Sequence, residues 1–132
     1  MKIGILGGSF EMIEDSDLNM IESSISISGT GSLSVNDQAN VVLEDESLLA
    51  IVTDGASANF NDNSHLELYT NSTFNMTGGN IEFAGHSIFD LWHGTNINVL
   101  NGSFVLSDDT VMTAYPETEG TIVGGNFHII DN

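Results

Sequence analysis

Three aromatic residues and two carboxylates recur at a fixed spacing, and they are the residues of this chain best suited to bind a sugar. Tyr69, Trp92 and Tyr115 follow one another at intervals of 23 residues, and Glu67 and Asp90 stand two residues before the first two of them. Aromatic rings offer a flat apolar surface, and carboxylates accept hydrogen bonds from hydroxyl groups. By strand alternation these five residues share one exposed face. The favoured interpretation is that the rings stack on one another for stability, and the alternative is that the five residues form a polysaccharide-binding face.

Glu67 and Asp90 also raise the question of glycoside hydrolysis. Retaining glycosidases hold two carboxyl groups about 5–5.5 Å apart, close to the spacing of neighbouring strands. A chain with 19 acidic residues brings carboxylates together by chance, however, and catalysis also requires a cleft and separated pKa values. The four histidines have no His or Cys partner at metal-binding spacing. We therefore expect no enzyme activity, with a glycoside hydrolase as the alternative.

A second set of residues, at nearly the same interval, consists of acids interrupted by one glycine at position 85. Its members are Glu14, Asp37, Asp62, Asp108 and Asp131. If these residues stack on neighbouring strands, like charges about 4.7–4.9 Å apart repel by on the order of 1 kcal/mol per pair in water. Ca²⁺ takes six to eight oxygen ligands, so the carboxylates, with Asn36, Asn61 and Asn63, form a candidate calcium site. The alternative is a solvated turn, and the sequence suggests no cofactor other than calcium.

Both sets follow a repeat that runs along the whole chain. A glycine, a short polar residue and an apolar-any-apolar triplet recur, as in Gly79-Asn80-Ile81-Glu82-Phe83. The second apolar position advances in steps of 23, 25, 23, 23 and 23 residues, through Met12, Val35, Phe60, Phe83, Leu106 and Ile129. Such a period indicates a repeat architecture.

Two further families of apolar triplets lie between successive copies of this phrase. One family is Leu18/Met20, Val41/Leu43, Leu66/Leu68, Phe89/Leu91 and Met112/Ala114. The other is Ile3/Ile5, Ile25/Ile27, Leu49/Ile51, Phe74/Met76 and Ile97/Val99. Because side chains alternate between the two faces of a strand, each period predicts three short strands with two inward apolar residues apiece.

A single period cannot fold alone. About six inward residues contribute roughly 1.5–3 kcal/mol each when buried, whereas ordering the backbone of about 23 residues costs roughly 1–2 kcal/mol per residue. Stacking equivalent strands pairs their backbone amides and joins the apolar residues into one core. The sequence therefore predicts an all-β fold, a single-stranded parallel β-solenoid of about five coils, as one domain over residues 1–132.

The charge of the chain excludes two classes of partner. There are 19 acidic residues and one basic residue, Lys2, which give a formal net charge of −18. Lys and Arg provide the phosphate contacts of nucleic-acid-binding proteins and the attraction to anionic membranes. No stretch approaches the 18 apolar residues of a membrane-spanning helix, and Met1–Phe10 lacks the form of a signal peptide. We expect no nucleic-acid partner and no membrane insertion.

The opening residues Met1–Phe10 resemble the first strand and glycine turn of nicotinate-nucleotide adenylyltransferases. That family continues with a Pro-and-His motif, whereas this chain continues with Glu11-Met12-Ile13-Glu14-Asp15. Gly8, Ser9 and Phe10 also belong to the 23-residue register. We therefore assign this segment to the repeat.

Three short strands in a coil of about 23 residues resemble the right-handed parallel β-helix of pectin-lyase-like proteins, autotransporter passenger domains and phage tailspikes. The resemblance is architectural and covers the whole chain. It implies a right-handed solenoid at an extracellular, cell-surface or virion location. The group includes polysaccharide lyases, hydrolases, adhesins and fibres, so the fold alone does not select a function.

Two functions follow as expectations. The first is a structural or adhesive solenoid that acts by end-to-end self-assembly or by surface contact, because solenoid ends expose unpaired amides and apolar side chains. The competing arrangements are a segment of a longer solenoid and a lateral trimer. The second function is a polysaccharide-binding or polysaccharide-degrading module that uses Glu67, Tyr69, Asp90, Trp92 and Tyr115.

Overall fold

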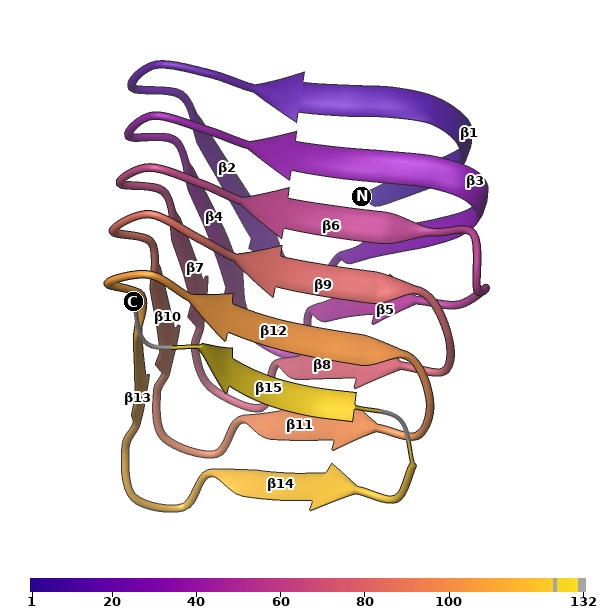
Figure 1. Ribbon diagram of the computed structural model, residues 1–132. Helices are drawn as coiled ribbons and strands as arrows, with labels where there is room; N and C mark the ends of the chain where they lie inside the picture. Colours follow the sequence, from indigo (N-terminus) through magenta and orange to yellow (C-terminus); the bar gives the residue numbers. More distant parts are fainter. Residues whose placement is uncertain (125, 131–132) are drawn as a thin grey trace.

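The computed structural model describes residues 1–124 and, for the backbone only, residues 126–130. Over these residues the chain is a parallel β-solenoid of about five coils (Figure 1), which confirms the predicted fold class. Every strand pair is parallel, and the strands form a 10-stranded and a 5-stranded sheet. The described residues include no helix that is long and apolar enough to cross a membrane.

The solenoid has three faces, each built from equivalent strands of successive coils. Face one contains β5 (Leu48–Ile51), β8 (Thr73–Met76), β11 (Asn96–Val99) and β14 (Glu119–Ile122). Face two contains β6 (Ser57–Phe60), β9 (Asn80–Phe83), β12 (Ser103–Ser107) and β15 (Asn126–Ile130). Face three contains β2 (Asp17–Ile21), β4 (Asn40–Glu44), β7 (His65–Leu68), β10 (Ile88–Leu91) and β13 (Val111–Ala114).

The first two coils differ from the predicted three short strands. β1 (Lys2–Met12) and β3 (Ser24–Val35) each run through the corner between face one and face two as one long strand. They remain paired through this corner, with a register shift between Ile5 and Gly7. The later coils break at the same corner, so that faces one and two carry separate strands there (Figure 1).

The alternation of side chains puts the predicted apolar residues in the core. Strands β6 to β8 and β10 to β11 alternate between half-buried and buried positions, and the buried positions are the predicted apolar ones. Phe60 and Phe83 stack with ring centroids 4.8 Å apart, and Phe83 stacks on Phe89 at the same distance. Residues about 23 positions apart therefore pack directly on one another inside the solenoid.

The corner between faces one and two explains the glycine of the repeated phrase. Gly79 and Gly102 have positive φ angles of 79° and 104°. A Cβ at Gly79 would clash with the Ala56 carbonyl oxygen, and one at Gly102 would clash with the Gly79 carbonyl oxygen. Only glycine combines this backbone conformation with so close an approach between coils.

The corner between faces three and one is closed by buried hydroxyl groups. Ser47 Oγ donates to the Glu44 carbonyl at 2.6 Å, Ser72 Oγ donates to the Leu43 carbonyl at 3.0 Å, and Thr95 Oγ1 donates to the Trp92 carbonyl at 2.9 Å. All three side chains are fully buried. These hydrogen bonds fix the chain directly after the aromatic positions at the end of face three.

Candidate functional site

The three predicted aromatic residues form one continuous stack at the end of face three, which we call the aromatic column (Tyr69, Trp92 and Tyr115). Tyr69 and Trp92 have ring centroids 5.2 Å apart and planes inclined by 7°. Trp92 and Tyr115 are closer, at 4.3 Å and 6°. All three side chains are half-buried on the outside of the solenoid. The prediction that these rings share an outward face is correct.

Glu67 binds two members of the aromatic column. The Tyr69 hydroxyl donates to Glu67 Oε2 at 2.6 Å, and Trp92 Nε1 donates to the same oxygen at 3.3 Å. Burial and the hydrogen bond to Glu67 raise the pKa of the Tyr69 phenol. The polar groups of Tyr69 and Trp92 are therefore directed at a carboxylate of the protein itself.

Asp90 lies beside Glu67 in the strand register and has its own partner. β10 pairs Asp90 with Glu67 on one side and with Thr113 on the other. Burial of the carboxyl group, with the nearby Glu67 carboxylate, raises the pKa of Asp90, while the hydrogen bond with Thr113 and the proximity of His65 oppose this rise. The structure thus brings together the five residues predicted for a glycan face.

The stacking limits what this face can bind. Trp92 has Tyr69 against one side of its ring and Tyr115 against the other. Sugars bind aromatic side chains through the flat face of the ring, where their C–H groups pack. In the aromatic column the inner ring faces are covered by neighbouring rings, so only ring edges and the two outermost faces are open. This geometry suits contact between coils better than contact with a saccharide.

The predicted acidic residues occupy one position of the turn between faces two and three. We call Glu14, Asp37, Asp62, Gly85 and Asp108 the turn column. Their φ angles are all positive, between 57° and 67°. Few residue types other than Gly, Asn and Asp adopt this left-handed conformation readily. The backbone of the turn therefore accounts for the aspartates and for the glycine at position 85.

Carboxylates of the turn column also bind the backbone of the preceding coil. The Glu14 amide donates to Asp37 Oδ2 at 3.2 Å, and the Gly85 amide donates to Asp108 Oδ2 at 3.3 Å. Asn36 and Asn61, predicted to assist in binding calcium, instead bond to one another at 3.0 Å. In the part of the chain that the structure describes, no group of three or more His, Asp or Glu side chains is arranged to hold a metal ion. Asp131 lies outside the described residues.

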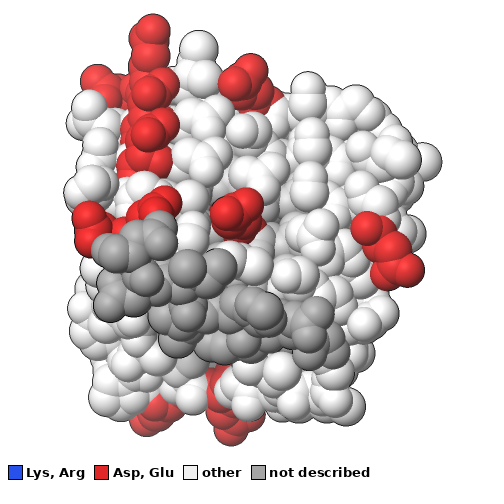
Figure 2. Space-filling model, viewed as in Figure 1, with Lys and Arg blue, Asp and Glu red and all other residues white. Residues whose placement is uncertain are grey.

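The charged side chains on the surface visible in Figure 2 are all acidic. Figure 2 shows them as a column over the turns that follow β1, β3 and β6, and it shows no Lys or Arg on this side of the molecule. His86 Nε2 lies 3.4 Å from Asp109 Oδ2, but both side chains are largely exposed. An exposed pair of this kind contributes at most about 1 kcal/mol. Ions in the surrounding solution, and not basic side chains on this surface, therefore screen the repulsion within the turn column.

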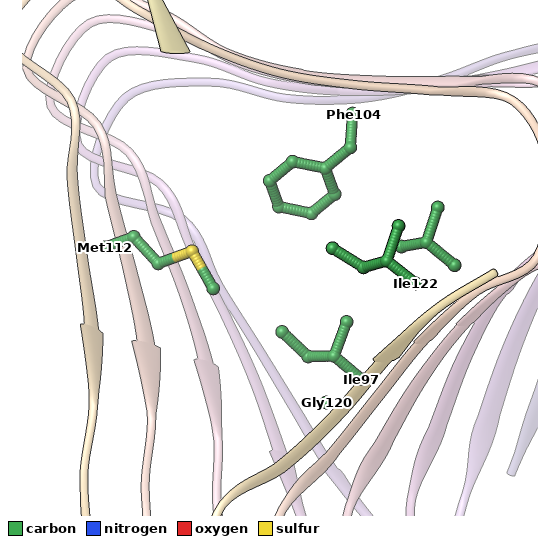
Figure 3. Close-up of a pocket in the computed structure, with 6 residues that line it drawn as sticks. Ile97, Phe104, Met112, Gly120 and Ile122 are labelled. Carbon is green, nitrogen blue, oxygen red and sulfur yellow. The ribbon is translucent and has the colours of Figure 1, made fainter. Parts of the chain in front are cut away.

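Sequence reasoning missed an apolar hollow at the edge of the solenoid formed by β13 and β14. The hollow has a volume of about 190 Å³ and opens among Ile97, Val99, Phe104, Met112, Gly120 and Ile122 (Figure 3). Gly120 pairs with Ile97 and so stands at an inward position that is apolar in the coils above. The signal that could have revealed the hollow was this glycine in an otherwise apolar column.

The two edges of the described solenoid expose apolar side chains. At the edge with β13 and β14, Val111 is 52% exposed and Ile122 is 54% exposed. At the edge with β1 and β2, Phe10 is 37% exposed, and Phe10, Met12, Ile13 and Leu18 line a second hollow. The outer backbone groups of these edge strands have no strand partner within the described part of the solenoid.

Comparison with protein-family models, with curated proteins and with solved structures found no match. The functional interpretation therefore depends on the chain's own geometry.

Proposed function

We propose that this protein is a structural β-solenoid that acts by self-assembly, with its edge strands as the contact surfaces. The observation behind the proposal is the exposure of apolar side chains at both edges, above all Ile122 beside the open hollow at Gly120. Parallel strands with unpaired amides accept a further strand, and the two edges differ, so successive contacts form an open filament.

The distribution of other features supports a structural role. The stacked rings of the aromatic column, the buried hydroxyls and the turn column all make contacts between one coil and the next. Glu67, the carboxylate best placed to bind a ligand, accepts hydrogen bonds from Tyr69 and Trp92. These side chains hold coils together and leave few polar groups free for a substrate.

Net charge controls when assembly occurs. A formal charge of −18 opposes the approach of two copies, and this repulsion falls as the Debye length shortens from about 30 Å at 0.01 M salt to about 3 Å at 1 M. We therefore assign salt, or a divalent cation such as Ca²⁺, as the trigger. Screening would make sodium chloride nearly as effective as calcium at equal ionic strength, whereas a specific calcium site would respond at far lower concentration.

Sedimentation velocity and electron microscopy test the proposal. The purified chain should sediment as a small particle at low salt and as filaments at high salt or in calcium. The matched control carries a charged capping helix fused after residue 132, which should stop growth by covering one edge. A protein that remains monomeric in both titrations would refute self-assembly, and capped chains that grow as long as uncapped ones would refute the edge as the contact surface.

A polysaccharide-binding module is the second candidate function, supported by the exposed edges of the aromatic column and the adjacent carboxylates Glu67 and Asp90. Binding would change the surroundings of Trp92, the single tryptophan of the chain. Titration with a panel of glycans, followed by Trp92 fluorescence, tests this candidate. A spectrum that no glycan changes would remove it.

The resemblance to right-handed parallel β-helices supports the remaining parts of the proposal. Adhesins, passenger domains and virion fibres of that group are structural, and we extend their extracellular, cell-surface or virion setting to this chain on that basis. Self-association and, for the second candidate, an extracellular glycan are the partners that we propose.

A further inference from the structure

We propose that two copies join head to tail in continuous strand register, so that β14 of one copy pairs in parallel with β1 of the next and Glu119 faces Lys2. This inference rests on the proposed self-assembly and specifies its contact. The occupant of the hollow at Gly120 is then the first coil of a second copy of this chain.

The register follows from the pairing already present in the solenoid. On face one the residues Lys2, Ser24, Leu48, Thr73, Asn96 and Glu119 stand opposite one another in successive strands. On face two the equivalent series is Ser9, Ser32, Ser57, Asn80, Ser103 and Asn126. A further coil in the same register puts Lys2 after Glu119 and Ser9 after Asn126, and β1 of the next copy supplies both of these positions. β2 follows β1 in the chain and so lies one coil further on, out of reach of β13, which means that the junction uses faces one and two.

The charges at this junction are complementary. Lys2 is the only Lys or Arg of the chain, and it is exposed on the edge strand β1. Glu119 is exposed at the matching position of the opposite edge strand, β14. Opposite charges on directly facing positions of paired strands stabilise the pair, and like charges destabilise it. The Lys2–Glu119 pair therefore favours head-to-tail contact over contact between two identical edges, in which Lys2 and Glu119 cannot face one another.

The apolar surfaces also match in register. The junction puts Ile3 next to Gly120 and Ile5 next to Ile122, since each pair continues an inward column. The hollow of about 190 Å³ at Gly120 is lined almost entirely by apolar groups. Gly120 and Ile122 of the edge strand β14 line it (Figure 3), and Ile3 and Ile5 of the second copy would cover these two residues. Closing the hollow removes the exposed side of Ile122 from water, which favours association.

The turn column sets the salt requirement of this junction. Joining two copies in this register also puts the acidic turn column of one copy in line with that of the next. The like charges of the two columns repel. Face one thus attracts while the turn repels, and the balance shifts toward association as salt screens the exposed turn.

Disulfide trapping tests the register directly, because the chain contains no cysteine. Gly4 and Thr121 are exposed, a Cβ at Gly4 would meet nothing within 4 Å, and continued register places the two residues opposite one another. Neighbouring strands are about 4.7–4.9 Å apart, within the range of about 4.4–6.8 Å between Cα atoms that a disulfide spans. Mixing Gly4→Cys with Thr121→Cys under mild oxidation in assembly salt should give a crosslinked dimer, and neither variant alone should.

The matched control moves one cysteine by one strand. Asn98 pairs with Thr121 in the neighbouring strand β11, so it lies about 9–10 Å from Gly4 across the proposed junction. Gly4→Cys mixed with Asn98→Cys should therefore not crosslink. Dimers of Gly4→Cys with itself, or crosslinking of the Asn98 pair instead of the Thr121 pair, would overturn the proposed register.

The result separates this inference from the proposed function. Filaments without the Gly4–Thr121 crosslink would overturn the junction and leave self-assembly standing. A chain that stays monomeric at every salt concentration would overturn both.

A charge-reversal series tests the Lys2–Glu119 contact. Glu119→Lys reduces the net negative charge, yet it should raise the protein concentration needed for assembly about fivefold, because it faces Lys2 of the next copy. Glu82→Lys makes the same charge change on exposed face two of a central coil, and it should lower that concentration. The double variant Lys2→Glu with Glu119→Lys keeps the net charge and should restore wild-type assembly. The Lys2–Glu119 contact would be refuted if Glu119→Lys and Glu82→Lys lowered the concentration needed for assembly equally. It would also be refuted if the double variant did not restore assembly.

Discussion

Phe83 in the middle of the solenoid and Ile122 at its edge hold comparable inward positions, but the structure treats them differently. Phe83 is fully buried, whereas Ile122 is 54% exposed. β9 alternates between exposed and buried residues, while all four residues of β14 are exposed. The second inward position is apolar in both strands, so the difference in burial between Phe83 and Ile122 comes from the coils around them and from Gly120, which replaces the first inward apolar residue in β14.

The comparison shows that an inward side chain of this protein is buried by the coils on either side of it. Phe83 is covered by Phe60 in the preceding coil and by Phe89 and Phe104 around the core. Within the described residues, the strand of Ile122 is paired on one side only. Solenoid stability is approximately a sum of contacts between nearest neighbours, so an edge coil has about half of the stabilising contacts and the greater capacity to gain a partner.

The largest effect should come from placing a charge at these two positions. Phe83→Asp buries an unpaired carboxylate and leaves a cavity, so we expect a loss of more than about 4 kcal/mol and an unfolded chain. Ile122→Asp can keep its charge in water and should cost about 1 kcal/mol or less. Urea unfolding followed by circular dichroism, at low salt where we expect the chain to be a monomer, measures both. Similar losses for the two variants would contradict the contrast between middle and edge.

The second comparison uses a glycine from each region. Gly85 has a φ of 67°, and a Cβ there would lie 2.9 Å from the Asp62 amide nitrogen. Gly85→Ala should therefore lower the free energy of unfolding by about 1–2 kcal/mol or more. Gly120 meets nothing within 4 Å, and Gly120→Ala should be neutral or should gain up to about 1 kcal/mol. Thermal unfolding of the two variants checks this, and a loss at Gly120 as large as that at Gly85 would mean that the edge coil is as tightly packed as the middle.

A third comparison concerns the turn column. Asp37 has acidic neighbours on both sides, Glu14 and Asp62, whereas Glu14 is at the edge and has one. Asp37→Asn keeps a residue that tolerates a positive φ angle and removes one charge from the turn column. It should therefore raise the free energy of unfolding by on the order of 1 kcal/mol at low salt. Glu14→Gln should gain less. Both gains in stability should vanish in about 1 M sodium chloride, because the salt then screens the repulsion between neighbouring carboxylates.

Melting temperatures at low and high salt measure this effect. A gain from Asp37→Asn that persists in high salt would show that the benefit is conformational, and a loss would show that the bond from the Glu14 amide outweighs the repulsion.

The smallest effect should be the pH dependence at Asp90. Burial raises the pKa of Asp90 in the folded chain above its unfolded value, so the folded state binds more protons and stability falls as pH rises through the raised pKa. Asp90→Asn removes this loss while its amide oxygen can still accept a hydrogen bond from Thr113. The variant should match the wild type near pH 3 and exceed it near pH 7. Unfolding free energies measured across this range would refute the assignment if the difference were independent of pH.

Much of the fold could be predicted from local patterns. The alternation of apolar residues correctly placed Phe60, Phe83 and Leu106 in the core and Tyr69, Trp92 and Tyr115 outside it. It could not predict that β1 and β3 run unbroken around a corner, because that depends on how two coils pair through it. The spacing found the members of the aromatic column, but it could not show that Glu67 binds two of them.

The amino-acid sequence by itself determined the period of the solenoid, the inward and outward positions, and the near absence of positive charge. These properties are local or compositional, and alternation in a strand follows from backbone geometry alone. Only the tertiary structure decided that the acids of the turn column occupy a left-handed backbone position, that the aromatic rings cover one another, and that Gly120 leaves an open hollow at the edge. Each of these depends on how one coil meets the next, because a contact between coils joins residues about 23 positions apart.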